Sequence, residues 1–181
     1  FKIKRKYLIN SKLVHLANYI YYRFFCRLNK QDMVSVIIAC KDAEENIIST
    51  LKSLEKQTYS NIEIIIIDDG SIDDSAKVIE EYKLKSTAKI ILKKLEKNLG
   101  SANARNVGMK LARGRYICFN DADDISHKRR IEFQVKALQS NKNKIFTECL
   151  YYRTYNNKKI KVNCRKYLLC IISMLFEKKK V

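Results

Sequence analysis

The sequence of 181 residues is 46% hydrophobic and carries a formal net charge of +18 at pH 7. A chain of this length and apolar content can bury one sizeable core, which excludes an intrinsically disordered protein and favours one main domain with short appendages. The charge lies at the two ends: residues 1–30 hold eight Lys and Arg and no acid, and residues 151–181 hold nine against one acid, whereas residues 31–150 hold 20 against 18. This near-neutral middle argues against nucleic acid as the partner of the main domain.

Residues 1–32 form a basic, aromatic extension that we expect to be helical. Its segment 13–28, LVHLANYIYYRFFCRL, is apolar and aromatic between cationic flanks. Two interpretations are open. Residues 1–30 either lie on an anionic membrane surface, with Lys and Arg at the headgroups, or form an ordinary packing helix.

From residue 33 onward, apolar runs typical of buried strands alternate with segments of helical spacing. The predicted strands are 33–39, 62–68, 88–95 and 115–120, and the predicted helices are 44–57, 73–83 and 101–113. Gly114 follows the last of these helices and suits its C-cap. The alternation predicts an α/β fold, namely a Rossmann-like, mostly parallel sheet with helices on both faces.

The cysteines point to a reducing compartment. None of the six forms a C-x-x-C pair, and the two histidines, His15 and His127, do not stand at zinc-finger spacing. Cys40 and Cys118 lie in apolar, strand-like runs, so we expect buried thiols and not a disulfide framework. No stretch has the roughly 20 uninterrupted apolar residues of a membrane span. We therefore expect a cytoplasmic protein, and the membrane interpretation of residues 1–30 would place it at the inner face of the plasma membrane.

Two acidic clusters follow predicted strands. Asp68 and Asp69 come after the second strand, and Asp121 and Asp123 after the fourth. Since ligands of parallel α/β sheets bind beyond the carboxyl ends of the strands, both clusters can reach one crevice. A divalent cation there would neutralise Asp121 and Asp123 and would also take phosphate oxygens. The sequence has neither a Walker P-loop nor a dinucleotide fingerprint, which favours a metal-held diphosphate.

Structural roles are the alternative for several of these residues. Ser71 and Asp74 have the spacing of a capping box, which leaves Asp68 and Asp69 unexplained. Asp124 and Ser126 would serve the start of the next helix, and a single histidine such as His127 is more often structural than a ligand. Glu148 is the only acid near the later strands, and we expect a surface carboxylate there.

Two stretches together resemble family 2 glycosyltransferases with the GT-A fold. They are VSVIIACKDAEENIISTLKSLEKQTYSNIEIIIIDDGSIDDS and NLGSANARNVGMKLARGRYICFNDADDISHKRRIEFQV. The resemblance covers about residues 33 to 150 and the donor-binding half of the family. Among its members, the chain is most similar to bacterial enzymes that build capsular and other surface polysaccharides.

The resemblance implies a role for each matching position. Asp123 would coordinate Mn²⁺ or Mg²⁺ between the two phosphates, and Asp121 would contact the ribose or the water shell of the metal. Asp69 would accept a hydrogen bond from the base, usually uracil. Other residues would border the base or support the phosphates, namely Ala39, Cys40, Lys41 and Asp42 for the base and Arg105 and Asn106 for the phosphates.

The chain departs from the family pattern in two places. Ala39-Cys40-Lys41-Asp42 stands where members usually have Pro-Thr-Tyr-Asn or similar, so the aromatic side chain that often stacks on the base is missing. The resemblance also implies a donor-binding domain over residues 33–155. Residues 156–181 would then begin an acceptor-side region, with ISMLFEKKKV as its preceding strand. The general base of an inverting enzyme would lie beyond the C-terminus, so the catalytic residue is unknown.

The expected function is therefore metal-dependent, inverting transfer of a sugar from a nucleoside-diphosphate sugar, a UDP-sugar in the first instance, to a glycan or lipid-linked acceptor. A donor-binding module without transfer activity is the first alternative. The second is a cationic protein that binds anionic membrane or nucleic acid through its ends, which a steep salt dependence of binding would support.

Overall fold

The structure is a computed structural model of the chain, and it describes residues 20, 28–141, 143–149, 153–155, 158–160 and 174–180. Most of the extension 1–32 lies outside these residues, and so does the predicted helix 13–28 apart from Ile20 and Leu28. The division of the chain at residues 32 and 155 stays a prediction.

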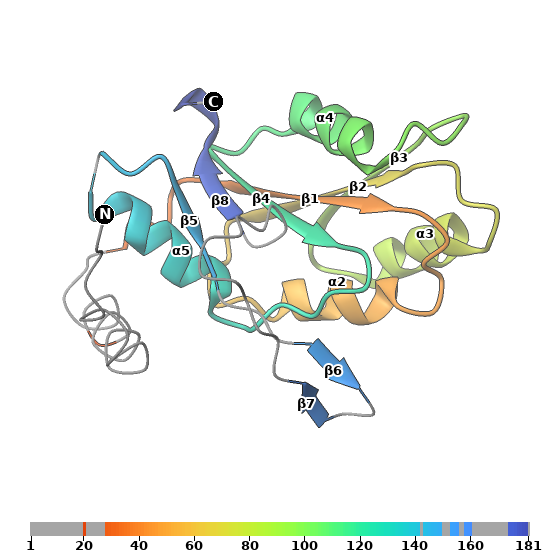
Figure 1. Cartoon of the computed structure of the whole chain (residues 1–181), viewed down its shortest axis with the longest axis horizontal. Coiled ribbons are helices and arrows are strands. Elements are labelled where there is room, and N and C mark those ends of the chain that lie inside the picture. The colour runs from red at the N-terminus through yellow and green to blue at the C-terminus, as the bar shows by residue number, and fades with distance from the viewer. Residues whose placement is uncertain are drawn as a thin grey trace, which may run out of the picture.

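A six-stranded sheet in the order β3-β2-β1-β4-β8-β5 forms the centre of the protein (Figure 1). The first four of these strands are parallel, whereas β8 runs antiparallel to both β4 and β5. The strands are β1 (Val34–Cys40), β2 (Ile62–Asp68), β3 (Lys89–Lys94), β4 (Tyr116–Asp121), β5 (Phe146–Glu148) and β8 (Met174–Glu177). The predicted, mostly parallel sheet is confirmed, and β8 forms within the stretch ISMLFEKKKV.

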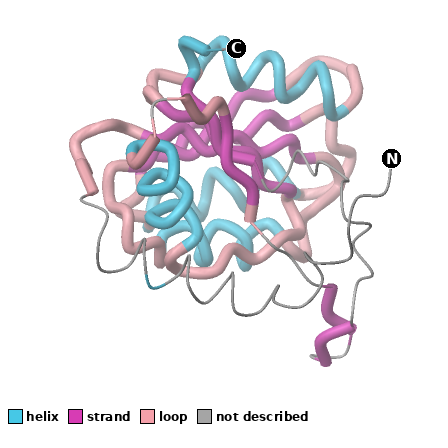
Figure 2. Tube along the Cα trace, turned by 60° about the vertical axis from the view of Figure 1, so that its left-hand side comes forward, coloured by secondary structure: helices cyan, strands magenta, loops and turns pink. Residues whose placement is uncertain are grey.

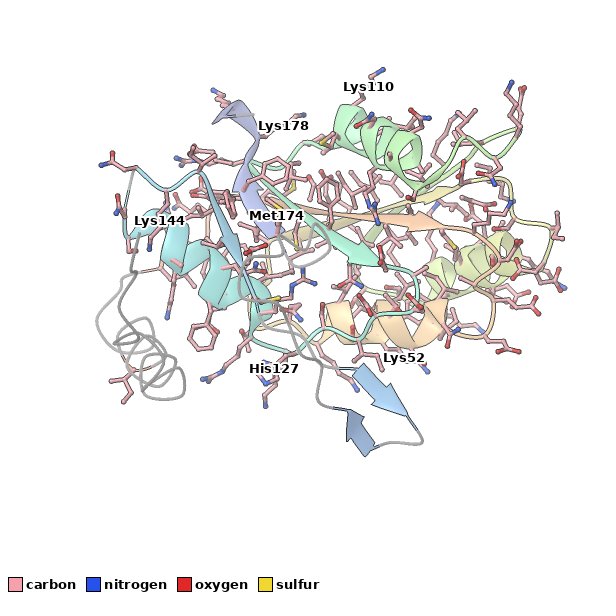
Figure 3. The ribbon with its side chains drawn as sticks, viewed as in Figure 1. Lys52, Lys110, His127, Lys144, Met174 and Lys178 are labelled. Carbon is pink, nitrogen blue, oxygen red and sulfur yellow. The ribbon has the colours of Figure 1, made fainter. Side chains whose placement is uncertain are left out.

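Helices cover both faces of this sheet, as the alternation predicts. Figure 2 shows the strands between two groups of helices, and Figure 3 shows Lys52 and Lys110 on opposite faces. One face carries α2 (Ile47–Glu55), α3 (Ser75–Lys85) and α5 (Arg130–Gln139), and the other carries α4 (Ser101–Leu111). The remaining elements are a small sheet of β6 (Arg153–Tyr155) and β7 (Lys158–Ile160) and a 3₁₀ turn, η4 (Lys178–Lys180).

The two core clusters follow the alternation of side chains along β1. Val36 and Ile38 face α2, α3 and α5, whereas Ile37 faces α4 together with Ile65 of β2. Successive residues of a strand point to opposite faces, so a strand buried on both faces needs a continuous apolar run. No helix in the described ranges is long and apolar enough to cross a membrane.

Two glycines bring backbone close to the sheet. A Cβ on Gly108 of α4 would lie 2.4 Å from Cγ2 of Ile37. A Cβ on Gly114 would lie 2.6 Å from the amide nitrogen of Ser35. The prediction that Gly114 caps α4 is wrong, because the helix ends at Leu111 with Ala112 as its cap residue. Gly114 is needed for close approach to β1 instead.

A buried carboxylate ties the amino ends of the strands together. Glu63 of β2 is fully buried and accepts hydrogen bonds from Ser35 Oγ at 2.6 Å, the Arg113 amide at 2.7 Å and Lys89 Nζ at 2.8 Å. Burial alone would raise the pKa of Glu63, but these donors outweigh it and leave the pKa below its ordinary value. The charge therefore stabilises the fold at the edge of the sheet opposite the acidic clusters.

Candidate functional site

The carboxyl ends of β1, β2 and β4 bring the two acidic clusters to one edge of the sheet. Cys40 pairs in register with Asp68 of β2, and Ala39 pairs with Asp121 of β4. Because β1 lies between its two partners, the clusters flank its last residues. The two clusters therefore lie at the same edge of the sheet, and their sharing of one crevice stays a prediction.

A cavity of about 260 Å³ opens at this edge. Its lining combines four residues that the resemblance places beside the base with three that the sequence does not single out: Ala39, Cys40, Lys41 and Asp69, then Asn98, Gly100 and Ser101. The last three belong to the N-L-G-S stretch of residues 98–101, whose Ser101 begins α4. Gly100 adopts a left-handed backbone with φ of 86°, a conformation that favours glycine. This glycine is the one local feature of the sequence that indicates a tight turn beside the cavity.

Asp69 joins the three loops around the cavity. Its carboxylate accepts the amide hydrogens of Leu99 at 2.7 Å and of Gly100 at 2.8 Å, one on each oxygen. Its own amide donates to the carbonyl of Cys40 at 2.8 Å. Each carboxylate oxygen has a second lone pair, so this nearly buried side chain can still accept a hydrogen bond from a ligand N–H.

The loops after β1 and β2 brace each other through Asp42. Its amide donates to Ser71 Oγ at 3.0 Å, and its Oδ1 accepts the amide of Ile72 at 2.9 Å. Asp42 is also the one non-glycine residue in the described part of the chain with a left-handed backbone, at φ of 47°. It does not line the cavity, and its predicted place beside the base stays a prediction. The capping-box alternative for Ser71 is wrong, because α3 starts four residues later, after Asp74.

Arg105 of α4 reaches the acidic end of β4. Its Nη2 lies 2.7 Å from Oδ1 of Asp121, and its guanidinium carbon lies 6.0 Å from the ring centre of Phe119. The Nε of Arg105 is buried and finds no acceptor among the described residues, which is uncommon for a buried donor. Asn106, the next residue of α4, is exposed. Part of the positive charge that the acidic cluster requires is thus supplied by the protein.

The turn after β4 is held from α2. Thr50 Oγ1 donates to the carbonyl of Ala122 at 2.8 Å, and Ser53 Oγ accepts the amide of Ser126 at 3.0 Å. His127 lies between α5 and α2 (Figure 3), and its Nδ1 accepts the amide of Arg129 at 3.3 Å. His127 is exposed, and the expectation that it is structural and not a ligand stays a prediction.

The site fits a hard divalent cation that shares its ligands with a diphosphate. Asp123 is exposed in the turn, and the side chain of Asp121 is one-third exposed, so both present oxygen ligands to solvent. Within the described ranges, no three His, Cys, Asp or Glu side chains gather into a complete metal cage. Mg²⁺ and Mn²⁺ commonly use one or two carboxylates together with substrate phosphates, which matches this donor set.

The thiols near the site are inert. Burial, with Asp68 nearby, raises the pKa of Cys40 to about 12, so the thiol stays protonated at neutral pH. Cys40 and Cys118 are free thiols and are buried, as expected. Glu148 of β5 is exposed, in agreement with a surface carboxylate.

A larger cavity of about 560 Å³ lies away from this edge. Arg115 borders it and bridges two carboxylates, Asp32 at 3.1 Å and Glu177 at 2.9 Å. Tyr116 also lines it and is the first residue of β4, so this cavity lies at the amino end of that strand. Ligands of parallel sheets bind at the carboxyl ends of the strands. The smaller cavity is therefore the stronger candidate for the ligand-binding site.

The chain belongs to glycosyl transferase family 2, whose profile matches residues 35–180. It is 40% identical over 111 residues to UDP-Glc:alpha-D-GlcNAc-diphosphoundecaprenol beta-1,3-glucosyltransferase WfaP of Escherichia coli, an alignment that covers 61% of this chain and 43% of that protein. It is 41% identical over 107 residues to the amylovoran biosynthesis glycosyltransferase AmsB of Erwinia amylovora, covering 58% and 35%. The chain thus matches less than half the length of these relatives.

Solved structures confirm the GT-A fold. The crystal structure of S. aureus TarS 1-349 in complex with UDP superimposes with a TM-score of 0.66 at 23% identity and covers 81% of this chain and 47% of that one. The mannosyltransferase PcManGT of Pyrobaculum calidifontis, in complex with GDP-Man and Mn²⁺, gives 0.64 at 18% identity and covers 76% and 42%. At these identities the likeness concerns the fold.

Proposed function

We propose that the chain forms the donor-binding part of a glycosyltransferase that acts in surface polysaccharide synthesis. The observation that carries the proposal is the meeting of the cavity, Asp69 and the Asp121–Asp123 turn at the carboxyl edge of one parallel sheet. The names of the Escherichia coli and Erwinia amylovora relatives support the polysaccharide assignment. The acceptor would be a glycan or a lipid-linked sugar.

The donor would be a nucleoside-diphosphate sugar, and we propose a UDP-sugar. The base would enter the 260 Å³ cavity, where the acceptor-only carboxylate of Asp69 receives an N–H of the base. The structure of TarS with UDP supports uridine, whereas that of the mannosyltransferase with GDP-Man shows that this fold also accepts a guanosine donor. The base therefore has to be established by experiment.

The diphosphate would lie over the end of β4, between α4 and the turn of residues 121–124. Asp123, with Asp121, would hold Mn²⁺ or Mg²⁺, which neutralises the charge that develops on the departing diphosphate. Arg105 is ion-paired with Asp121, and its partly exposed guanidinium would also attract a phosphate. An inverting transfer also needs a base that accepts the proton of the acceptor hydroxyl, and we assign that role to none of the described residues.

The first test is a nucleotide panel. The melting temperature of the chain is measured with UDP, GDP, CDP and ADP, each with Mn²⁺ and with EDTA. A ligand that binds only the folded state stabilises it in proportion to the logarithm of its concentration over Kd. We expect the largest shift with UDP and Mn²⁺. A larger shift with GDP would reassign the base, and the absence of any metal-dependent shift would contradict the proposed donor site.

A further inference from the structure

Asn120 stands directly before Asp121 and is buried beneath the turn that carries the proposed metal ligands. Its side-chain amide nitrogen donates to the carbonyls of Asp121 at 2.8 Å and of Asp124 at 3.0 Å. Its Oδ1 accepts from Ser126 Oγ at 2.7 Å and from Arg130 Nη1 at 2.7 Å. Both donors and both acceptor positions of the amide are therefore used, and the two donors join the two ends of the turn.

Arg130, the first residue of α5, supplies a fork of donors beneath the same turn. Besides Asn120, it donates to Ser126 Oγ at 2.9 Å, to the carbonyl of Phe119 at 2.8 Å and to Gln134 Oε1 at 3.2 Å. The pairing of β4 with β8 ends at Cys118. Arg130 thus takes the place of a partner strand at Phe119, the first residue beyond the ladder.

The orientation of the Asn120 amide depends on Arg130. A guanidinium only donates hydrogen bonds, so it requires an acceptor opposite Nη1. The amide oxygen must face Arg130, and the amide nitrogen must then face the carbonyls of Asp121 and Asp124. A rotated amide would place its N–H₂ against the guanidinium and its oxygen against two carbonyls. Arg130 thus favours the same orientation of the amide that the two carbonyls of the turn require.

We propose that Arg130, acting through Asn120, is the positioning residue of the metal-binding turn. The pair holds the backbone of Asp121–Asp124 so that Asp121 and Asp123 face a diphosphate-bound divalent cation, and neither member of the pair touches the ligand. The inference rests on the proposed function, because that function is what gives the turn a metal to hold. Groups that orient metal ligands typically change metal affinity by about 10- to 100-fold when they are removed.

Two variants separate positioning from packing and charge. Asn120→Asp is nearly isosteric, and its carboxylate still accepts from Arg130 and Ser126 but can donate to neither carbonyl of the turn. Arg130→Lys keeps the positive charge but loses the planar fork that reaches Phe119, Asn120 and Ser126 together. The matched control is Arg115→Lys, because Arg115 also makes two polar side-chain contacts, to Asp32 and Glu177, at the amino end of β4.

Two measurements are made on the whole chain. Calorimetric titration of UDP with Mn²⁺ reports metal-dependent binding, and hydrogen–deuterium exchange without metal reports the order of residues 121–126. We expect both site variants to weaken Mn²⁺-dependent UDP binding by about 10- to 100-fold and to speed exchange in residues 121–126. We expect Arg115→Lys to change neither quantity by more than about twofold.

The outcomes separate this inference from the proposed function. If the unaltered chain binds UDP with Mn²⁺ and both site variants bind it equally well, the inference is wrong and the proposed function stands. If the unaltered chain does not bind UDP with Mn²⁺, the proposed donor fails, and the exchange experiment still shows whether Arg130 and Asn120 hold the turn. Unchanged exchange in both variants would overturn the inference in either case. Should Arg130→Lys fail to fold, Asn120→Asp decides.

Discussion

Arg105 and Asp121 form an ion pair of 2.7 Å between the helix on one face of the sheet and the end of its central strand β4. Sequence resemblance assigns both residues to the donor site, although they come from different elements. The pair shows that the residues meet, and it neutralises one of the carboxylates that gather at the end of β4. A bound diphosphate would compete with Asp121 for this guanidinium.

We expect Arg105→Met to weaken Mn²⁺-dependent UDP binding at least about tenfold, because a charge-assisted contact to the diphosphate is lost. Its cost in stability should be about 1 kcal/mol or less, since both side chains are partly exposed. Lys110→Met on the same helix is the control, because Lys110 is exposed near the other end of α4. Equal affinities for UDP in the two variants would contradict the assignment of Arg105.

Asp69→Asn tests the carboxylate at the cavity. The substitution removes the charge and brings an amide N–H₂ toward the Leu99 and Gly100 amides, so at least one backbone donor loses its partner. We expect a loss of about 1–3 kcal/mol in the free energy of unfolding, measured by urea denaturation, together with loss of UDP binding. Asp74→Asn is the comparison, because Asp74 is an exposed aspartate before α3 that does not line the cavity. An equal loss of UDP affinity in both variants would contradict a direct contact between Asp69 and the base.

Gly108→Ala tests the close contact of α4 with the sheet. The added Cβ would overlap Ile37, and overpacking of a filled core typically costs about 1–3 kcal/mol. Since α4 carries Arg105, UDP binding should weaken as well. Lys110→Ala is the control, because Lys110 is exposed on the same helix and lies outside the cavity. A Gly108→Ala variant as stable as the original chain would show that α4 can shift freely.

The buried Glu63 predicts a pH dependence of stability. The pKa of Glu63 is lower in the folded than in the unfolded chain, so its contribution is fully present above the unfolded pKa of about 4.3 and is lost as the pH falls through the folded value. Glu63→Gln should therefore lower stability by about 1–3 kcal/mol at pH 7. Urea titrations at several pH values give the difference in the free energy of unfolding between Glu63→Gln and the original chain. This difference should become smaller below about pH 4. A difference in the free energy of unfolding that does not change with pH would contradict the stabilising role of the Glu63 carboxylate.

The sequence predicts the sheet well because its strands are continuous apolar runs buried on both faces. The strand 62–68 is found as β2 with the same bounds. The helix ends are predicted less well. The predicted helix 101–113 ends at Leu111, because Gly114 has to approach Ser35, and a contact between residues so far apart in sequence leaves no local signal.

The sequence predicts the position of the acids at strand ends, and the structure places Asp69 and Asp121 at the same edge of the sheet. The sequence does not single out Asn98 and Ser101, because polar residues between a strand and a helix are common. Only the folded connection from β3 to α4 brings them to the cavity. The sequence does not single out Asn120 and Arg130 either, and the reason is different. Their importance lies in the direction of their hydrogen bonds, which depends on where the β4–β8 pairing ends.

The most direct test of the account is calorimetric titration of UDP into the chain with Mn²⁺, repeated with EDTA and with Asp123→Ala. Glu45→Ala, another exposed carboxylate in a loop, is the control. The account predicts binding that needs both the metal and Asp123 and that Glu45→Ala leaves intact. Binding that persists in EDTA or in Asp123→Ala, or no binding in a cooperatively melting sample, would contradict a metal-held nucleoside diphosphate at this edge of the sheet.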